Sequence, residues 1–430
     1  MPPQMTPPHA LTVPFAPRGL GGRITVPPSK SITQRALVAA ALAGDGACVR
    51  RPLDAEDPRL LYRALRAAGY RLTWEGDEVR AAGWAPGRGG GVHMGNNGTG
   101  VRFMLAQLAA TAGEWTLDGI ARLRERPIAP LAQALQDLGA DVSARGAPLA
   151  LPLRVVGRPL EGGEVALDAT ASSQFVSALL LLGARLPRGL AVDLAKAPPS
   201  RPYVALTIEV LRAFGAEAGY DEAALHAWVS APSWRAAELT VEGDWSAAAF
   251  PLAGVAVAGG EVELPGLSAA STQGDAAMLG LLEGAGCRVS STPGRLTVRG
   301  PASRPVHADL RDTPDLFPAL AVVVAAVGGR LTGLEGLAAK ESDRLNLMAE
   351  NLNALGFAIV ADSRELTAPG SRPRSGTTAP LACGGDHRIA MALAVAGCIV
   401  PGVCVDDAAC VAKSWPDFWR HWQALIPEPS

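Results

Sequence analysis

The chain has 430 residues, of which 48% are hydrophobic and 19% are charged, and its formal net charge is −2. This length is sufficient for two or three domains with large cores, and the absence of a basic excess argues against a nucleic-acid-binding protein. The longest apolar run, residues 389–405, contains Gly397, Pro401 and Gly402 and is shorter than the roughly 20 residues that span a membrane.

The cysteine and histidine patterns argue against disulfide bonds and against a metal site. The six cysteines form no Cys-x-x-Cys pair and most have apolar neighbours, which is typical of reduced thiols in a cytoplasmic core. The six histidines form no His-x-x-x-His set, so we expect no metal site. The first 17 residues hold four prolines by Pro8 and no lysine or arginine, so we expect a loose arm rather than a signal peptide.

Two helical patterns recur along the chain. The first is an apolar helix with a polar start and a glycine stop, predicted over residues 30–44, 97–113, 172–183, 244–259, 314–328 and 386–397. The second is an amphipathic helix that ends in Leu-x-x-x-Gly, with its glycine at position 69, 139, 215, 286 or 356. The glycines are 70 to 76 residues apart, so six such units fill the chain as a repeat.

Each unit reads as strand, buried helix, strand, amphipathic helix and one or two further strands. Three units would close around their three buried, parallel helices, which predicts two similar α/β domains. We expect one domain to combine residues 1–22 with 243–430 and the other to span residues 23–242. The amino ends of the buried helices would then gather on one face of each domain, and the active site would lie in the cleft between the two faces.

The first buried helix has a cationic, hydroxyl-rich amino end. A strand-like run at Ile24 and Val26 precedes it, Ser29 is a good N-cap, and Lys30, Ser31 and Arg35 occupy the first two turns. Free N–H groups and the helix dipole favour an anion at such an end. A capped core helix with one snorkelling lysine explains this helix equally well when it is taken alone. Polar starts on all six buried helices favour a ligand with several negative charges.

Lysine is scarce in this chain. Of 39 basic residues only four are lysines, at positions 30, 196, 340 and 413. A compact ammonium group is not interchangeable with a guanidinium, so these lysines mark positions where it is needed, although chance retention is the alternative for each.

Four further motifs in the first half suit oxygen-rich ligands. In the glycine-rich turn of residues 95–102, Gly98 would let backbone N–H groups approach an anion. Arg126, directly before Pro127 at a helix start, is suited to a carboxylate or phosphate. Hydroxyl and amide groups occur at helix starts in Ser172-Ser173-Gln174 and, with lower specificity, at Ser200.

The second half supplies the acids. Asp315 opens a helix and could act as a base or orient a hydroxyl. The densest charged cluster is Lys340-Glu341-Ser342-Asp343-Arg344, where a helix would place Lys340 and Arg344 on one face. A solvated amphipathic face is the alternative for this cluster. Arg388 and Lys413 add two cations, and acids among cations suit proton transfer with charge stabilisation.

Taken in order, these motifs resemble the 5-enolpyruvylshikimate-3-phosphate synthase family, also called 3-phosphoshikimate 1-carboxyvinyltransferase. The resemblance covers nearly the whole chain through Pro-Ser-Lys-Ser (28–31), Gly-Asn-x-Gly-Thr (95–99), Arg-Glu-Arg-Pro (124–127), Ser-Ser-Gln (172–174), Glu-Gly-Asp (242–244), Pro-Asp (314–315), Lys-Glu-x-Asp-Arg (340–344), Asp-His-Arg (386–388) and Ala-Lys (412–413). It implies two domains of three βαβαββ units each, the inside-out α/β barrel of the enolpyruvyl transferase fold.

The resemblance also implies the activity. The enolpyruvyl group of phosphoenolpyruvate passes to the 5-hydroxyl of shikimate 3-phosphate and phosphate leaves, by addition and then elimination, in the shikimate pathway of aromatic amino acid biosynthesis. It implies no metal or organic cofactor. We expect no nucleic-acid or membrane partner and a cytoplasmic, monomeric enzyme.

Site residues follow from the matching positions. Catalytic roles are implied for Glu341, which handles the proton of the methylene carbon, and for Asp315 and Lys30 around the attacking hydroxyl. Positions that hold phosphoenolpyruvate are Lys30, Gly98, Arg126, Gln174, Arg344, Arg388 and Lys413. Positions that hold shikimate 3-phosphate are Lys30, Ser31, Arg35, Ser172, Ser173, Gln174, Ser200, Asp315 and Lys340.

Several positions depart from the family pattern, and two other functions stay open. Gly336 and Gly385 stand where asparagine is usual, Arg201 stands where lysine is usual, and Asn97 is an unusual neighbour of the glycine turn. UDP-N-acetylglucosamine enolpyruvyl transferases open with Pro-Gly-Ala-Lys-Asn-Ala and use a loop cysteine, whereas this chain has no cysteine between positions 48 and 287. A non-catalytic phosphate or carboxylate binder would need the cations but neither Glu341 nor Asp315.

Overall fold

The computed structural model describes residues 10–427 except 86, 145, 147–148, 293 and 374–378. The chain divides into two compact units, which we call the amino unit, Pro28–Glu242, and the carboxyl unit, which runs up to Pro27 and resumes at Gly243. The first crossing therefore lies after Pro27 rather than after Gly22. The reason is that Gly22 and Arg23 still pair with the strand that contains Glu263, and the Ile24 amide donates to the Glu263 carbonyl.

The amino unit contains three four-stranded sheets. Its helices are α1 (Lys30–Ala43), α2 (Glu56–Ala67), α3 (Gly98–Ala109), α4 (Ala121–Glu125), α5 (Ala129–Asp137), α6 (Gln174–Gly183) and α7 (Pro202–Ala213). Its strands are β3 (Cys48–Arg50), β4 (Tyr70–Glu75), β5 (Glu78–Trp84), β6 (Gly90–His93), β7 (Gly113–Asp118), β8 (Asp141–Ala144), β9 (Leu153–Gly157), β10 (Gly163–Leu167), β11 (Leu190–Leu194), β12 (Ala218–Asp221), β13 (His226–Val229) and β14 (Glu238–Thr240).

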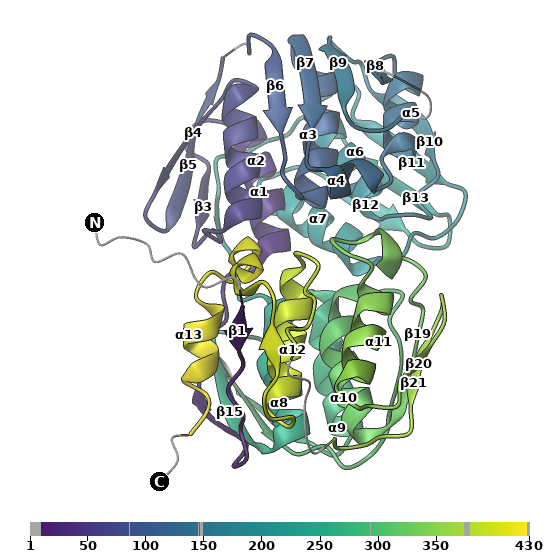
Figure 1. Ribbon diagram of the computed structural model, residues 1–430. Helices are drawn as coiled ribbons and strands as arrows, with labels where there is room; N and C mark the ends of the chain where they lie inside the picture. The colour runs from purple at the N-terminus through teal and green to yellow at the C-terminus, as the bar shows by residue number, and fades with distance from the viewer. Residues whose placement is uncertain are drawn as a thin grey trace. The chain divides into compact units, whose positions relative to one another are not determined.

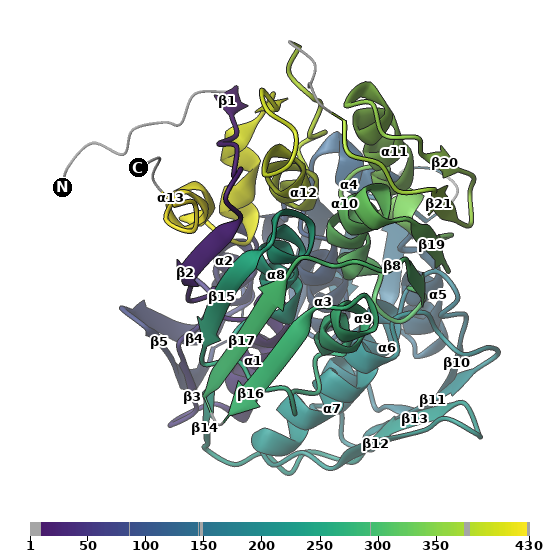
Figure 2. The same cartoon turned by 90° about the horizontal axis from the view of Figure 1, so that it is seen from below.

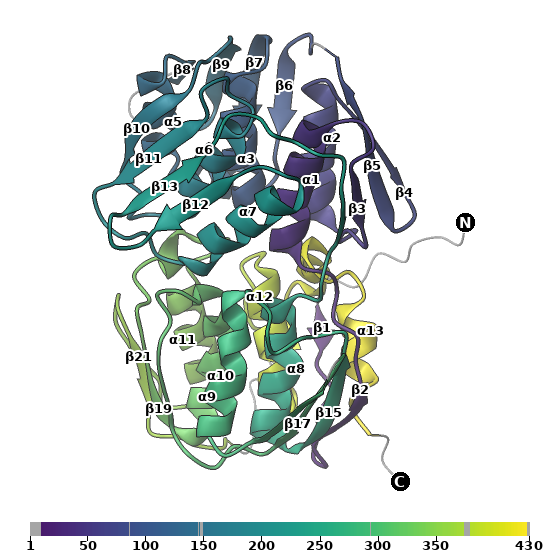
Figure 3. The same cartoon turned by 180° about the vertical axis from the view of Figure 1, so that it is seen from behind.

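The three sheets share one topology. Their strand orders are β14-β3-β5-β4, β6-β7-β9-β8 and β10-β11-β13-β12, in which the first pair is parallel and the other two are antiparallel. The first sheet takes its outer strand, β14, from the end of the unit, so residues 238–240 close the ring of repeats. The sheet of β10 to β13 is seen from the outside in Figure 3.

The apolar helices α1, α3 and α6 form the centre of the amino unit, where they pack against one another inside the sheets (Figure 1). They are buried because their sequences offer no polar face beyond the first turns. A glycine lies two residues after the last residue of each amphipathic helix: Gly69 after α2, Gly139 after α5 and Gly215 after α7. Each has φ near +90° to +100°, the left-handed conformation that glycine adopts without strain.

The carboxyl unit repeats this plan. Its strands are β1 (Leu11–Thr12), β2 (Leu20–Arg23), β15 (Gly260–Pro265), β16 (Arg288–Thr292), β17 (Arg295–Gly300), β18 (Val306–Asp309), β19 (Gly329–Thr332), β20 (Val360–Ala361), β21 (Leu366–Ala368) and β22 (Cys404–Val405). Its α-helices are α8 (Trp245–Ala258), α9 (Met278–Gly284), α10 (Phe317–Val327), α11 (Arg344–Ala354), α12 (His387–Gly397) and α13 (Phe418–Gln423). Its 3-10 helices are η1 (Gly274–Ala277), η2 (Pro314–Leu316), η3 (Leu337–Ala339) and η4 (Ala408–Lys413).

The carboxyl unit has two four-stranded sheets of the same topology and one reduced sheet. The orders are β2-β15-β17-β16 and β18-β19-β21-β20, while β1 and β22 form an antiparallel pair. Helices α8, α10 and α12 pack together inside these sheets and are seen end-on in Figure 2. The sixth repeat is thus shorter than the other five in the described residues, and the amino-terminal segment supplies one of its strands.

Most of the buried helices end at or directly before the glycine that the sequence predicted. Gly44, Gly259 and Gly328 directly follow α1, α8 and α10. The helix predicted over 97–113 is shorter, because α3 ends at Ala109 and Gly113 already begins β7. The expected strand at Ile24 and Val26 is also displaced, since β2 ends at Arg23.

Across the described residues, no helix is both long enough and apolar enough to span a bilayer.

Candidate active site

Lys30 opens α1 in a closed, polar environment. It is 9% exposed, and its Nζ lies 3.1 Å from Oδ2 of Asp57, a carboxylate that is 2% exposed near the start of α2. Ser29 caps the helix by accepting a hydrogen bond from the Ile32 amide, which leaves the amino end aligned with the ammonium group. The Lys30 ammonium and its Asp57 partner therefore lie at the amino end of a buried helix, where the helix dipole favours an anion.

Arg35 lies one turn further into α1 and is 1% exposed. Its guanidinium donates to the Thr207 hydroxyl at 2.7 Å, to the Ser31 carbonyl at 3.0 Å, and to acceptors on Ser177 and Tyr203. Burial lowers the pKa of Arg35 to about 10. The side chain thereby ties α1 to α6 and α7 and supports Ser31, which is half-buried beside Lys30.

The guanidinium of Arg126 lies directly against Gly98, the first residue of α3. A Cβ added at Gly98 would lie 2.4 Å from Cζ of Arg126 and 2.5 to 2.6 Å from its terminal nitrogens. Arg126 ends the short helix α4 in an extended conformation and is 6% exposed. Because Gly98 has no side chain, the Arg126 guanidinium can lie directly over the amino end of α3, where anions are favoured.

Side-chain hydrogen bonds join the amino ends of the three central helices. The Asn97 amide donates to the Gln34 side chain on α1 and to the Asp57 carbonyl, each at 2.8 Å, while its carbonyl oxygen caps α3. Arg102 on α3 donates to Oε1 of Gln174 at the start of α6. The predicted cations and amide of this unit thus belong to one connected face, which we call the amino half-site: Lys30, Gly98, Arg126 and Gln174.

The predicted hydroxyl groups border the amino half-site. Ser173 is buried and directly precedes α6. The half-buried Ser172 accepts a hydrogen bond through its hydroxyl from the backbone N–H of Gln174. Ser200 is 7% exposed and has φ +57°, an uncommon conformation for a residue other than glycine. Such strained residues often occur at ligand sites.

Arg344 is the centre of the charged cluster in the carboxyl unit. It is 1% exposed and forms ion pairs with Asp386 at 2.8 Å, Asp315 at 2.7 Å and Glu341 at 2.8 Å. Burial alone would lower its pKa, but these three carboxylates outweigh burial and hold the pKa of Arg344 above its usual range. Asp386 also caps α12 through the Arg388 amide.

Asp315 in η2 joins two guanidinium groups. Its second oxygen lies 3.1 Å from Nη2 of Arg388 on α12. Burial would raise the pKa of Asp315, but Arg388, Lys340 and Arg344 together hold it well below the usual range. Asp315 is therefore ionised and oriented, and we call the group of Asp315, Lys340, Glu341, Arg344 and Arg388 the carboxyl half-site.

The predicted helical face through Lys340 and Arg344 is wrong. The helix α11 begins only at Arg344 because the Asp343 side chain caps it by accepting from the Asn346 amide, and residues 340–343 form turns before it. Glu341 nevertheless reaches Arg344 and is 9% exposed, while Lys340 is half-buried at the end of η3. Lys413 ends η4 and is 4% exposed.

Sequence reasoning missed several polar residues of these half-sites. Asp57 pairs with Lys30, and a buried pair on α8 and η1, Ser246 and Asp275, shares a hydrogen bond. Asp275 is 3% exposed. A charged residue in the first turn of an amphipathic helix is ordinary helix chemistry, so nothing in the local sequence marked these carboxyl groups as special.

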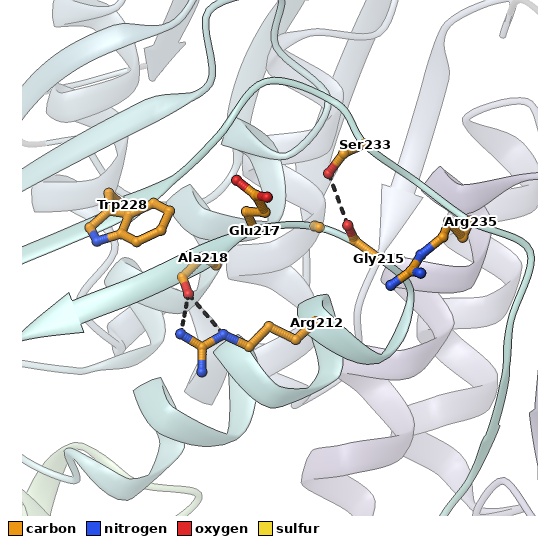
Figure 4. Close-up of a pocket in the computed structure, with 8 residues that line it drawn as sticks. Arg212, Gly215, Glu217, Ala218, Trp228, Ser233 and Arg235 are labelled. Carbon is orange, nitrogen blue, oxygen red and sulfur yellow. Dashed lines mark hydrogen bonds between the residues drawn. The ribbon is translucent and has the colours of Figure 1, made fainter.

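Two surface cavities lie away from the predicted residues. The larger, about 610 Å³, is an open hollow of the amino unit at the end of α7 and beside β13 (Figure 4), lined by Arg212, Gly215, Ala216, Glu217, Ala218, Trp228, Ser233 and Arg235. The other, about 320 Å³, lies in the carboxyl unit between residues 14–18 and the segment after α13. No predicted site residue lines either cavity.

Comparison with known proteins places the chain in a family. A family model described as EPSP synthase (3-phosphoshikimate 1-carboxyvinyltransferase) matches residues 16–422. Proteins named 3-phosphoshikimate 1-carboxyvinyltransferase are similar to this chain, among them one from Syntrophobacter fumaroxidans, 39% identical over 95% of this chain and 97% of its own. Another, from Methanoculleus marisnigri, is 37% identical over 92% of this chain and 94% of its own.

Solved structures agree in fold. An EPSP synthase from Acinetobacter baumannii has a TM-score of 0.77 at 24% sequence identity and covers 97% of this chain and 98% of its own. This likeness shows the two-unit enolpyruvyl transferase fold, and the sequence matches carry the assignment further. The chain belongs to the EPSP synthase (3-phosphoshikimate 1-carboxyvinyltransferase) family.

Proposed function

We propose that this protein transfers the enolpyruvyl group of phosphoenolpyruvate to the 5-hydroxyl of shikimate 3-phosphate and releases phosphate. The observation that carries the proposal is the carboxyl half-site, where the acids Glu341 and Asp315 share the buried Arg344. A binder of anions needs cations alone, whereas two carboxylates placed among cations suit a reaction that moves protons.

In the proposed reaction, both half-sites act on one pair of substrates. The cations of the amino half-site, with Arg344, Arg388 and Lys413, hold the carboxylate and phosphate of phosphoenolpyruvate. Shikimate 3-phosphate is held by the residues around α1 and α6, namely Lys30, Ser31, Arg35, Ser172, Ser173, Gln174 and Ser200, together with Asp315 and Lys340. Arg35 acts mainly by fixing Ser31, because most of its N–H groups already have protein acceptors.

The chemistry has two stages. In the addition, the 5-oxygen forms a bond to C2 of phosphoenolpyruvate and loses its proton towards Asp315 and Lys30, while C3 takes a proton from Glu341. In the elimination, C3 returns a proton to Glu341 and the bond from C2 to the phosphate oxygen breaks. The cations stabilise the charge that builds up on the departing phosphate.

Glu341 needs a proton before it can give one. The ion pair with Arg344 favours the ionised carboxylate of Glu341. A substrate anion at Arg344 would compete with Glu341 for this guanidinium and add negative charge beside it, and both effects favour protonation of Glu341. Substrate binding would thus prepare the acid for the addition step.

The test is the release of inorganic phosphate from phosphoenolpyruvate, measured with shikimate 3-phosphate, with UDP-N-acetylglucosamine and with neither. We expect release only with shikimate 3-phosphate. Release with the UDP-sugar would favour the sister enolpyruvyl transferase. A lack of release with both acceptors, or release when no acceptor is present, would contradict a transferase. Glu341→Gln, which keeps the size of the side chain, should lose most turnover and still bind shikimate 3-phosphate.

We also propose that the enzyme works as a cytoplasmic monomer. The six cysteines are free thiols in the structure, which suits a reducing compartment. Light scattering after size exclusion should give a mass near 44.2 kDa, and a dimer mass at micromolar concentration would contradict the monomer.

A further inference from the structure

Asp275 is a buried carboxyl group for which the proposed reaction has no role. It lies in η1, 3% exposed, and its Oδ2 accepts a hydrogen bond from the Ser246 hydroxyl at the start of α8. Its other oxygen, Oδ1, is fully buried and has no hydrogen-bond partner in the described residues. A buried acceptor without a partner costs stability, which makes this carboxyl group a candidate for a functional role.

The charged groups that face Asp275 come from three elements. They are Asp315 of η2, Arg388 of α12 and Asp244, the N-cap of α8. Two of them, Asp315 and Arg388, are the ion pair of the carboxyl half-site. Asp275 therefore acts on the reaction centre through its charge, and a single proton decides whether that charge is present.

We propose that Asp275 is a positioning residue that takes up a proton when phosphoenolpyruvate binds and so adjusts the charge around Arg388 and Asp315. This inference rests on the proposed function and adds a residue to it. A neutral Asp275 leaves Arg388 to the substrate anion and to Asp315, whereas an ionised Asp275 competes for Arg388 and repels the anion.

The environment of Asp275 makes this proton exchange possible near neutral pH. Burial raises the pKa of Asp275, the negative charge of Asp315 raises it further, and the Ser246 hydrogen bond lowers it, giving a pKa of about 7. An additional anion bound nearby disfavours the ionised form. Phosphoenolpyruvate should therefore raise this pKa, and the protonated enzyme should bind it more tightly by the same factor.

Asp275→Asn is the first test, because asparagine resembles the neutral acid and can still accept from Ser246. The KM for phosphoenolpyruvate is measured at pH 6 and pH 8 with saturating shikimate 3-phosphate. At pH 6 the variant and the wild type should agree, since Asp275 is already neutral. At pH 8 the wild-type KM should exceed that of the variant by about fivefold, because one pKa unit of coupling reaches its full tenfold effect only at higher pH.

Ser246→Ala gives a second, opposite shift. Loss of the hydroxyl removes a hydrogen bond that stabilises the ionised carboxylate, so the midpoint of the KM profile should move to higher pH. Asp362→Asn, at an exposed turn between β20 and β21, is the matched control and should reproduce the wild-type profile. A ratio of wild-type to Asp275→Asn KM that is the same at both pH values would overturn the proposal.

A measurement without turnover separates this inference from the proposed function. In protein labelled with ¹³C at the aspartate carboxyl groups, one resonance should titrate near pH 7, vanish in Asp275→Asn and move to higher pH in Ser246→Ala. Phosphoenolpyruvate alone should shift this titration upward. If the titration stays in place when phosphoenolpyruvate is added, the proposal is wrong even if phosphate release confirms the reaction. If the shift occurs but shikimate 3-phosphate gives no release, the proposed function fails and the proton uptake stands.

Discussion

Gly98→Ala tests whether Arg126 holds phosphoenolpyruvate. The new methyl group would lie 2.4 Å from Cζ of Arg126, whereas ordinary contact begins near 3.4 Å. Arg126 must therefore move by about 1 Å, and it can do so because the clash is with the far end of a flexible side chain. Displacements of this size at a reacting centre cost on the order of 100-fold.

The expected loss of affinity can also be estimated from the hydrogen bond that Arg126 would donate to phosphoenolpyruvate. A hydrogen bond to a charged group contributes about 1.5 to 3 kcal/mol, which corresponds to about a 10- to 100-fold rise in KM. We expect this rise in the KM for phosphoenolpyruvate and a much smaller change in the KM for shikimate 3-phosphate. The assay is steady-state phosphate release with each substrate varied in turn.

The matched control is Gly280→Ala in α9, where an added Cβ would meet nothing within 4 Å. This variant should keep both KM values and be slightly more stable than the wild type. An unchanged KM for phosphoenolpyruvate in Gly98→Ala, or an equal rise for both substrates, would refute the role given to Arg126.

Three further predictions concern charge. Lys30→Arg should reduce turnover strongly, because a larger guanidinium must fit beside Asp57 in a 9% exposed position. Arg201→Lys, at an exposed pair with Glu222, should leave turnover nearly unchanged. Equal losses of turnover in the two variants would discredit the need for an ammonium group at Lys30. Asp386→Ala should cost about 3 kcal/mol in urea unfolding, because it removes a buried partner of Arg344, and a loss below about 1 kcal/mol would show that Asp315 and Glu341 compensate. The folded-state pKa of Asp275 is about 7 and its unfolded value is about 3.9, so its stabilising contribution is fully present below about pH 4 and is lost as the pH rises through 7. The unfolding free energy of the wild type should thus fall between pH 5 and 8 by about 3 kcal/mol more than that of Asp275→Asn, and parallel curves would contradict a raised pKa.

The sequence predicted the helices better than the contacts between them. Gly44, Gly259 and Gly328 mark helix ends because each follows the last helical turn with a positive φ, and the apolar runs before them leave burial as the only solution. The error at residues 340–344 was avoidable, since an aspartate such as Asp343 is a preferred N-cap and predicts a helix start at Arg344.

The supporting carboxylates could not be predicted from the sequence. Asp57 is 27 residues from Lys30, and Asp275 is 29 residues from Ser246. Such pairs depend on how the buried helix packs against the segment that opens the amphipathic helix of the same repeat unit, which local patterns do not encode. Lys30, Arg35 and Arg388 were easier to find, because they lie in the first turns of helices whose starts the sequence already marked.

The most direct test of the account is deuterium exchange at the methylene carbon of phosphoenolpyruvate. The account assigns the C3 proton to Glu341, which exchanges with solvent between the addition and the elimination. During turnover with shikimate 3-phosphate in D₂O, the wild type should place deuterium in the vinyl group of the product and of recovered phosphoenolpyruvate, and Glu341→Gln should place almost none. Deuterium incorporation at the wild-type rate in Glu341→Gln would contradict the central role of this carboxyl group.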